Sequence, residues 1–345
     1  MIRMVDFRTI DIHWTTADQL PCPQVTIGEL PDDILLDIFS FYLNHQRDSE
    51  DAWHALVHVC RRWRCRMYAS PRRLRLRLLC TGKRPIKEAL DVWPELPIVI
   101  HAGEFNPTRI QTLETNVIAA LEHHDRVCDI HIDDVHPTLL LKMFSVMKKP
   151  FPSLINLEII SDLFHEPSTF PDSFLGGSAP RLQSLAFYNI LLPSPQIGKL
   201  LLSARNITFL CFDLILRSGP GCPSPEAMVN GLSVLTRLTS LRLTFNLDTL
   251  QPQSQQSSGH PPPSVRVDLP ALTEISFHGD KQYVEDVVSR IDTPLLANIT
   301  INLFDRSMLV TSPFRDFISR TENFGACPKI YTNTSDGRIE IKFLR

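Results

Sequence analysis

Apolar residues recur along most of the chain in short clusters that share one spacing. Seven clusters each contain three apolar residues, of which the second lies three positions after the first and the third lies two positions after the second. Four of the seven begin with a proline. The middle apolar residues of the seven clusters are Ile130, Leu157, Leu185, Leu210, Leu241, Ile275 and Ile299. Alternation with a period of two is typical of strands that bury one face. The pattern therefore predicts seven strands, separated by steps of 27, 28, 25, 31, 34 and 24 residues.

Stretches with helical character lie between the predicted strands. Residues 108–122 and 280–291 each gather apolar residues on one helical face, and 138–147 follows a proline. Ser224 and Ser312 each precede a proline, which pairs a capping side chain with a residue suited to the first helical turn. Alternating strands and helices predict an α/β fold with a largely parallel sheet. Repeats of about 20–29 residues built from one strand and one helix are typical of leucine-rich solenoids, and we expect a solenoid of this kind.

The two longest steps coincide with segments that interrupt the pattern. Residues 218–224 are rich in Gly and Pro, and residues 251–264 are rich in Gln, Ser and Pro. Such compositions are typical of segments without a packed core. We therefore expect 251–264 to be a disordered insertion within a recognition domain that spans 71–345.

The first 70 residues follow a different pattern. Residues 1–26 show no sustained period and predict a flexible leader, whereas residues 27–70 predict three short helices. The first helix is announced by Leu30-Pro31-Asp32-Asp33, because proline suits the first helical turn and acids suit the positive end of the helix dipole. Its apolar stripe consists of Ile34, Leu35, Ile38 and Phe39.

Two further helices complete the N-terminal prediction. One is centred on Trp53, and the next runs through Val59, Cys60 and Trp63 and stops before Pro71. We expect Leu30, Ile34, Ile38 and Phe39 to face Val59 and Trp63, with Cys60 at a core position. About forty residues make a thin core, so this module should depend on a partner or on the following domain.

Residues 61–84 form a basic stretch with ten Arg and Lys and neither Asp nor Glu. Leu74, Leu76 and Leu78 alternate with arginines there, which favours a solvated helix face followed by a strand with arginine on its outer side. A binding surface for a polyanion or for an adaptor protein is the alternative interpretation. Over the whole chain the net charge is −3, so no global field attracts nucleic acid or membrane.

Composition is typical of an intracellular globular protein. Hydrophobic residues make up 43% and charged residues 21% of the 345 residues. No apolar run approaches the ~20 residues of a membrane span, and the start of the chain lacks a secretory h-region. Eight cysteines are scattered without a C-x-x-C pair, which fits a reducing compartment. The sequence therefore predicts a protein of the cytoplasm or nucleus, with neither a membrane nor a nucleic acid as partner.

Two groups of histidines and cysteines have spacings that could suit a metal ion. The first group is His54, His58, Cys60 and Cys65, and the second is His123, His124, Cys128, His131 and His136. The first lies within predicted helices, and His131 alternates with inward isoleucines and should lie at the surface, so we expect no metal site. The sequence contains neither a G-x-S-x-G motif nor a Gly-rich phosphate loop with its lysine. We therefore expect no catalytic residues, no cofactor and no enzyme.

The period of two also locates a candidate recognition surface. In each predicted strand, the residues between the inward positions point to the opposite, open face of the sheet. The outward pairs are His131/Asp133, Glu158/Ile160, Ala186/Tyr188, Cys211/Asp213, Arg242/Thr244, Ser276/His278 and Thr300/Asn302. The target-binding candidates among them are Glu158, Tyr188, Asp213, Arg242 and His278. Tyr188 and Arg242 are the stronger anchors, because Tyr and Arg dominate binding hot spots; the alternative is an ordinary solvated sheet face.

The N-terminal residues carry a family resemblance. The stretch Leu30-Pro31-Asp32-Asp33-Ile34-Leu35 with Ile38-Phe39, followed by Val59-Cys60-Arg61-Arg62-Trp63-Arg64, resembles the F-box motif. The run Ser70-Pro71-Arg72-Arg73-Leu74, with Asp91-Val92-Trp93-Pro94-Glu95-Leu96-Pro97-Ile98 after it, resembles F-box proteins of mushroom-forming fungi with a divergent leucine-rich C-terminal domain. The resemblance implies a substrate receptor of an SCF-type ubiquitin ligase. A Skp-family adaptor, and through it a cullin scaffold, would bind the F-box, and the C-terminal domain would bind an unknown target protein.

The resemblance also implies roles for individual residues. The positions that match the F-box core and adaptor contact are Leu30, Pro31, Ile34, Leu35, Ile38, Phe39, Val59, Cys60 and Trp63. One departure is the spacer 41–52, which is longer than the usual link between the first two helices and moves Leu43 out of register. Two other interpretations stay open: a leucine-rich-repeat interaction scaffold without a ligase role, and an α/β enzyme with a deep polar pocket.

Overall fold

The computed structural model describes residues 26–45, 52–82, 85–93, 96–103, 110–161, 171, 173–190, 194–214, 223–245, 266–303, 312–321, 329–335 and 338–344. The expected leader, apart from Thr26, and the expected insertion at 251–264 lie outside the described residues. The chain divides into two compact units, Met1–Arg75 and Leu76–Arg345. Each unit is considered by itself below.

The N-terminal unit is built from three helices. α1 spans Asp32–His45, α2 spans Ala52–Val57 and α3 spans Arg61–Ala69, which confirms the helical prediction. α1 begins where the Pro31 carbonyl oxygen accepts a 3.0 Å hydrogen bond from Leu35 N. The buried side chains of the three helices include Leu35, Leu36, Phe39, Trp53, Leu56, Val57 and Met67. This small core holds the unit together.

The predicted strand through Leu74, Leu76 and Leu78 is shorter than expected. Residues 71–75 form turns, and Arg75 has a positive φ of 52°, which interrupts an extended strand. β1 is limited to Leu78–Cys80. The three leucines are nevertheless buried and the arginines between them exposed. The period of two therefore predicted burial correctly, but the strand begins only at Leu78.

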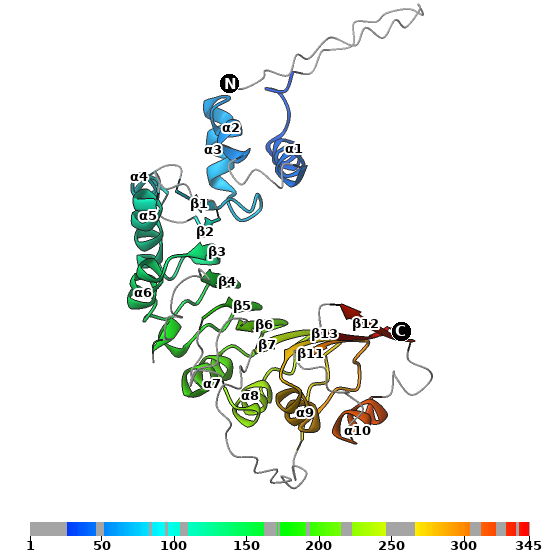
Figure 1. Cartoon of the computed structure of the whole chain (residues 1–345). Helices are drawn as coiled ribbons and strands as arrows, with labels where there is room; N and C mark the ends of the chain where they lie inside the picture. The colour runs from blue at the N-terminus through cyan, green and yellow to red at the C-terminus, as the bar shows by residue number, and fades with distance from the viewer. Residues whose placement is uncertain are drawn as a thin grey trace, which may run out of the picture. The chain divides into compact units, whose positions relative to one another are not determined.

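The C-terminal unit is a mixed α/β structure around one large sheet (Figure 1). Among the described residues, nine parallel strands follow the order β1, β2, β3, β4, β5, β6, β7, β9 and β11. After β1 their bounds are Ile98–Ala102, Val127–Val135, Asn156–Ser161, Ser184–Tyr188, Phe209–Leu214, Ser240–Phe245, Glu274–Gly279 and Asn298–Leu303. The seven strands predicted from the clusters are consecutive members of this sheet, so the prediction of a largely parallel α/β fold is confirmed.

The middle apolar residue of each cluster pairs directly with that of the next strand. Ile130 is in register with Leu157, and Leu157 with Leu185. The row continues through Leu210, Leu241, Ile275 and Ile299. All seven side chains are buried. Each repeat thus adds one residue to a continuous apolar row that a single repeat could not bury alone.

A recurring turn accounts for the first apolar residue of six of the seven clusters. Leu154 donates its backbone N–H to the Phe151 carbonyl oxygen at 3.3 Å. The same bond to the residue three positions earlier starts from Leu182, Ile207, Leu238, Leu272 and Leu296. Threonines join neighbouring turns: Thr239 Oγ1 donates to Thr208 O at 2.9 Å, and Thr273 Oγ1 donates to Thr239 O at 3.0 Å. The same carbonyls also accept backbone N–H groups of the next repeat, so each threonine adds a second link between neighbouring turns.

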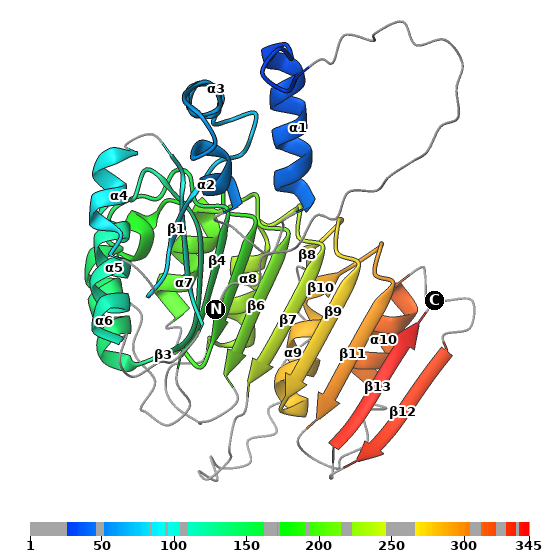
Figure 2. The ribbon, with the colours of Figure 1, turned by 90° about the horizontal axis from the view of Figure 1, so that it is seen from above.

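Helices form a second layer on one face of the sheet, whose curvature places them on its convex side (Figures 1 and 2). Their bounds are Lys87–Val92 (α4), Ile110–Glu122 (α5), Pro137–Val146 (α6), Phe174–Gly177 (η2), Ser194–Ser203 (α7), Pro225–Leu232 (α8), Lys281–Ser289 (α9) and Ser312–Arg320 (α10). The expected serine cap is present at α8, where Ser224 Oγ accepts a 3.2 Å hydrogen bond from Ala227 N. Within the described ranges, no helix is long and apolar enough to cross a membrane.

Several strands lie outside the seven predicted ones. β1 and β2 precede them, and β13 (Arg338–Leu344) and β12 (Lys329–Ser335) extend the sheet antiparallel beyond β11. β8 (Val267–Asp268) and β10 (Ile291–Asp292) form a separate parallel pair. None of these strands carries the complete apolar spacing of the clusters. The repeat pattern therefore could not predict them.

At Gly279 the backbone of β9 lies too close to the backbone of β7 to leave room for a side chain. Gly279 pairs with Phe245, and an added Cβ would fall well inside contact distance of the Phe245 carbonyl oxygen. The sheet holds both backbones, so Gly279→Ala should destabilise the unit by about 1–3 kcal/mol in denaturant unfolding. Gly198→Ala in α7 is the control, because nothing lies within 4 Å of its added Cβ. It should be neutral or stabilise by up to ~1 kcal/mol, and equal effects at both glycines would contradict the packing described.

Candidate functional site

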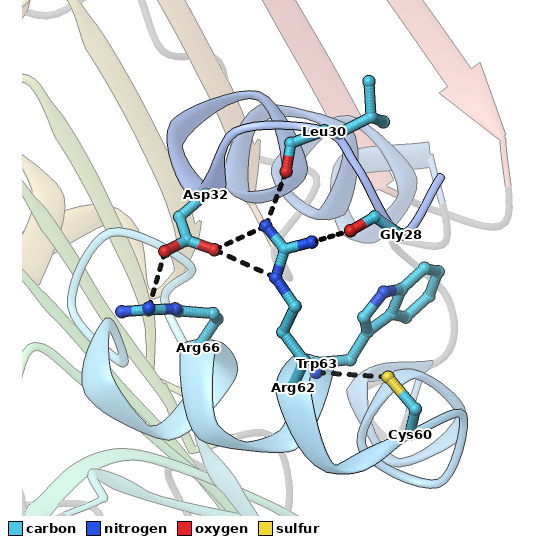
Figure 3. Close-up of polar contacts among 7 residues, drawn as sticks. All are labelled: Gly28, Leu30, Asp32, Cys60, Arg62, Trp63 and Arg66. Atoms are coloured by element: carbon cyan, nitrogen blue, oxygen red, sulfur yellow. Dashed lines mark hydrogen bonds and ion pairs between the residues drawn. The ribbon is translucent and has the colours of Figure 1, made fainter. Parts of the chain in front are cut away.

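One arginine ties the turn before α1 to α3 (Figure 3). Arg62 donates from Nε and Nη2 to Asp32 Oδ1 at 3.2 and 2.8 Å. Its Nη2 group also donates to the Leu30 carbonyl oxygen at 2.5 Å, and its Nη1 group donates to the Gly28 carbonyl oxygen. Arg66, one turn later, pairs with Asp32 Oδ2 at 2.6 Å. A planar guanidinium suits such convergent acceptors, so Arg62 fixes the entry into α1.

These arginines also stabilise the ionised form of the Asp32 carboxyl. The hydrogen bond from Arg62, with the nearby charges of Arg66 and Arg62, holds the pKa of Asp32 below its ordinary value of 3.8. The stabilising contribution of this carboxylate is therefore complete above that value and is lost as the pH falls through the lowered pKa. Arg73 pairs with Asp37 at 2.5 Å. Part of the basic stretch 61–84 is thus engaged in ion pairs within the N-terminal unit.

The outer side of α1 carries apolar side chains that the unit does not bury. Ile34 and Ile38 are 43% and 40% exposed, and Tyr42 is 37% exposed. Residues spaced by four lie along one stripe of a helix. Val59, in the turn before α3, is 58% exposed. An exposed apolar stripe such as that of α1 is typical of a protein–protein contact site.

The opposite side of α1 packs inside the unit. Leu35 and Phe39 are fully buried, and the Phe39 ring centroid lies 4.7 Å from that of Trp63. The expectation that Ile34 and Ile38 share this inward stripe is wrong. Adjacent residues of a helix are about 100° apart, so the four apolar residues divide between an inward and an outward side.

Cys60 does not occupy the core position that the sequence led us to expect. It is exposed and forms the N-cap of α3, where its Sγ accepts a 3.5 Å hydrogen bond from Trp63 N. A capping side chain has to stay at the helix end to reach a free N–H group, so it cannot also point into the core. Leu30 and Leu43 are half-buried, and Pro31 is exposed.

The second candidate surface is the sheet face opposite the helical layer of the C-terminal unit (Figure 2). The five target-binding candidates, Glu158, Tyr188, Asp213, Arg242 and His278, alternate with buried residues of their strands and therefore lie on this face. Tyr188 pairs with Asp213, and Thr244 pairs with both Asp213 and His278. The structure thus brings three of the candidates into one row. Glu158 and Arg242 lie in the next row, separated by Ala186 and Cys211.

His131 joins two acids at the β3 side of this face. Its Nδ1 lies 3.0 Å from Glu158 Oε2, and its Nε2 lies 3.2 Å from Asp133 Oδ2. The His101 ring packs edge to face against it at 4.9 Å. The Nδ1 contact joins β3 to β4, whereas the Nε2 contact stays within β3. His131 alternates with buried residues and lies on the open face, as expected, and it is half-buried there.

Three outward residues are buried although the alternation placed them on the open face. They are Ala186, Cys211 and Thr244. Burial raises the pKa of the Cys211 thiol to about 11. Burial, with a hydrogen bond to Cys211, also raises the pKa of Tyr188. Alternation predicts the direction in which a side chain points and does not predict whether other atoms cover it.

Asp213 is a carboxyl with little access to water. Burial raises its pKa from 3.8 to about 6, against the opposing influence of the Thr244 hydroxyl and the Arg242 guanidinium. Thr244 is the register partner of Asp213 on β7, and a hydrogen bond between the two side chains opposes the effect of burial on the pKa of Asp213.

Asp213→Asn should stabilise the C-terminal unit near neutral pH and have little effect in acid. The folded chain binds the proton of Asp213 more tightly than the unfolded chain does, so its stability falls as the pH rises from 3.8 to about 6. Since the side chain is half-buried, we expect a gain of about 1–2 kcal/mol above that range. Urea unfolding at both ends of the range measures it. The exposed Asp316→Asn variant is the control, and a gain for Asp213→Asn that is equal at both pH values would contradict the assignment.

Metal-binding groups do not converge in the described ranges: no three His, Cys, Asp or Glu side chains there are placed to hold a metal ion. Two histidines of the second predicted group have structural contacts instead. His124 Nδ1 lies 2.8 Å from the Pro150 carbonyl oxygen, and His136 caps α6 by accepting from Thr138 N at 3.3 Å.

Residues 27–69 match the family model described as F-box-like. The matched region contains α1, α2 and α3, so the three-helix unit holds an F-box-like domain, as the motif predicted. The comparison with curated proteins returned no match to the chain.

Proposed function

We propose that this chain is a substrate-recognition subunit of an SCF-type ubiquitin ligase. The observation that carries the proposal is the coincidence of an F-box-like domain with an exposed apolar stripe on its first helix. F-box domains bind Skp-family adaptors, and such an adaptor would cover Ile34 and Ile38. Through the adaptor the chain would reach a cullin scaffold, in the cytoplasm or the nucleus.

The nine motif residues divide into three roles in this proposal. Ile34, Ile38 and Val59 contact the adaptor, because they are apolar and exposed. The inward residues, Leu35, Phe39 and Trp63, fix the angle between α1 and α3. The remaining residues, Leu30, Pro31 and Cys60, hold the two helix starts.

The C-terminal residues 71–345 serve in this proposal as the target-recognition domain, a leucine-rich-repeat-like solenoid of the kind found in mushroom-fungal F-box proteins. Support comes from the apolar row in register along seven strands and from the turn that recurs before them. The target binds the open face through Glu158, Tyr188, Asp213, Arg242 and His278. The role is binding, and no catalytic step is assigned to the chain.

Reconstitution with a purified Skp-family adaptor tests the ligase role. The full chain and the adaptor should form a complex on size-exclusion chromatography, and adding the cullin scaffold should extend it. A folded chain that forms no such complex would reject the ligase role. It would leave the interaction scaffold without a ligase role as the better interpretation.

Tyr188→Ala and Arg242→Ala should each weaken target capture by at least ~1 kcal/mol, about fivefold, with adaptor binding unchanged. Targets are scored by proximity labelling with the proteasome inhibited, as enrichment relative to the parent chain. Arg205→Ala removes an equally exposed arginine outside the sheet and is the matched control. A double variant at Tyr188 and Arg242 that keeps every target would move recognition to another surface, with the basic stretch 61–84 next in line.

A further inference from the structure

The N-terminal unit carries a positive charge that the chain as a whole does not. Its described residues, 26–45 and 52–75, contain seven arginines and four acids, so with neutral histidines their net charge is +3. The entire chain has a net charge of −3. The four acids are Glu29, Asp32, Asp33 and Asp37. The unit that holds the F-box-like domain therefore has a local positive field of its own.

Only some of the seven arginines are neutralised within the unit. Arg62 and Arg66 pair with Asp32 (Figure 3), and Arg73 pairs with Asp37. A fourth arginine donates from its Nε to a backbone carbonyl oxygen of α2. Three exposed arginines remain, which form no ion pair with any residue that the structure describes: Arg61, Arg72 and Arg75. These three residues are called the basic border below.

Two members of the basic border belong to a turn that lies beside α1. The Arg72 carbonyl oxygen accepts a 3.3 Å hydrogen bond from Arg75 N. Between them, Arg73 Nη2 lies 2.5 Å from Asp37 Oδ1 and 3.5 Å from the Asp33 carbonyl oxygen. Asp37 is three positions after one isoleucine of the exposed stripe and one position before the other, and residues three apart are neighbours on a helix surface. The turn therefore follows the edge of the apolar stripe.

The third member of the basic border stands next to the other exposed apolar residue of the unit. Arg61 begins α3 and is exposed, two positions after Val59, which is 58% exposed. Protein–protein interfaces commonly have an apolar centre and a polar rim. Charged groups at the rim increase the rate of association with a partner of opposite charge. The apolar stripe and its basic border together fit a partner whose apolar surface is surrounded by acidic residues.

We propose that the Skp-family adaptor presents acidic residues around the surface that covers α1, and that the basic border steers the adaptor into place. This inference rests on the proposed function, because it names the charge of the partner at the same site. A nucleic acid would also be attracted by three arginines. It would leave the apolar side chains of Ile34 and Ile38 in water, so an acidic protein surface fits both features better.

The association rate constant of the full chain with purified Skp-family adaptor tests the proposal, with surface plasmon resonance as the measurement. The triple variant Arg61→Gln, Arg72→Gln and Arg75→Gln should associate at least about fivefold more slowly at ~0.1 M salt, where the Debye length is about 10 Å. At ~1 M salt the Debye length is about 3 Å, and the two rate constants should agree within about twofold. Dissociation rate constants should differ by less than about twofold, because rim charges act mainly on association.

A second triple variant makes the same change of charge in the other compact unit. Arg181, Arg205 and Arg315 are exposed there, and glutamine at all three should leave the association rate constant within about twofold of the parent chain. An equal loss in both triple variants would assign the effect to net charge and overturn the proposal. Circular dichroism verifies that both variants keep their helices.

An association rate that is unchanged by the Arg61, Arg72 and Arg75 replacements, or that is independent of salt, would also overturn the proposal. A chain with that behaviour still binds the adaptor, so it keeps the ligase role and loses only the basic border. A chain that binds no adaptor loses both. Labelled random-sequence RNA is the remaining probe. If the parent binds this RNA through the three arginines while adaptor association ignores them, the basic border serves a nucleic acid and the proposal is wrong.

Discussion

Replacing both Ile34 and Ile38 with glutamate is expected to weaken binding of the Skp-family adaptor at least ~100-fold while the N-terminal unit stays folded. Both side chains are exposed on α1, whereas Leu35 and Phe39 form its buried side, so the new charges do not enter the core. In the proposed complex the two positions become buried. A buried carboxylate without a partner is strongly unfavourable, and a 100-fold loss corresponds to about 2.8 kcal/mol.

The control for this double variant introduces glutamate at two exposed leucines of the C-terminal unit. Leu141 in α6 and Leu202 in α7 are 55% and 52% exposed, and glutamate at both should leave adaptor affinity within twofold. Isothermal titration calorimetry with purified adaptor measures the affinity, and circular dichroism reports the helices. If the Ile34/Ile38 variant is folded and binds as tightly as the parent chain, the adaptor contacts a different surface.

The sequence predicted the C-terminal sheet well because its pattern repeats. A single apolar cluster is ambiguous, but seven with one spacing have to stack so that Ile130, Leu157 and their successors form one row, and the register of the strands agrees with this. Elements that occur once escaped prediction. The strand expected from Leu74 failed because Arg75 adopts a positive φ, a local turn that no periodicity reveals.

The candidate sites were predicted in outline and missed in detail. A motif match marks residues without saying which side of a helix each one takes, so Ile34 and Phe39 were placed together although one is exposed and the other buried. Arg62 was not among the predicted site residues. Its role depends on backbone carbonyls about thirty residues away. These contacts are a property of the folded chain, so they could not be found in spacing alone.

Phe212→Ala is expected to destabilise the C-terminal unit by about 3–5 kcal/mol. Phe212 is fully buried in β6, and its ring stacks on that of Phe187 with centroids 6.2 Å apart and planes at 6°. The rings continue through Phe174, 6.0 Å from Phe187, to Phe144, 5.5 Å from Phe174. This chain of rings joins the sheet to η2 and α6, so truncation leaves a cavity between the two layers. Phe212→Leu retains most of the volume and should cost less than ~1.5 kcal/mol.

Hydrogen exchange of the backbone amides in the Phe212→Ala variant distinguishes a solenoid from a single cooperative core. If each repeat is stabilised mainly by its neighbours, hydrogen exchange in Phe212→Ala should accelerate most in β5, β6 and β7 and least in β11. Target capture should fall, because Asp213 is the next residue of the same strand. Adaptor binding should persist, since the F-box-like domain lies in the other compact unit. Equal loss of protection in every strand would contradict nearest-neighbour stabilisation, and loss of adaptor binding would show that the two units depend on each other for folding.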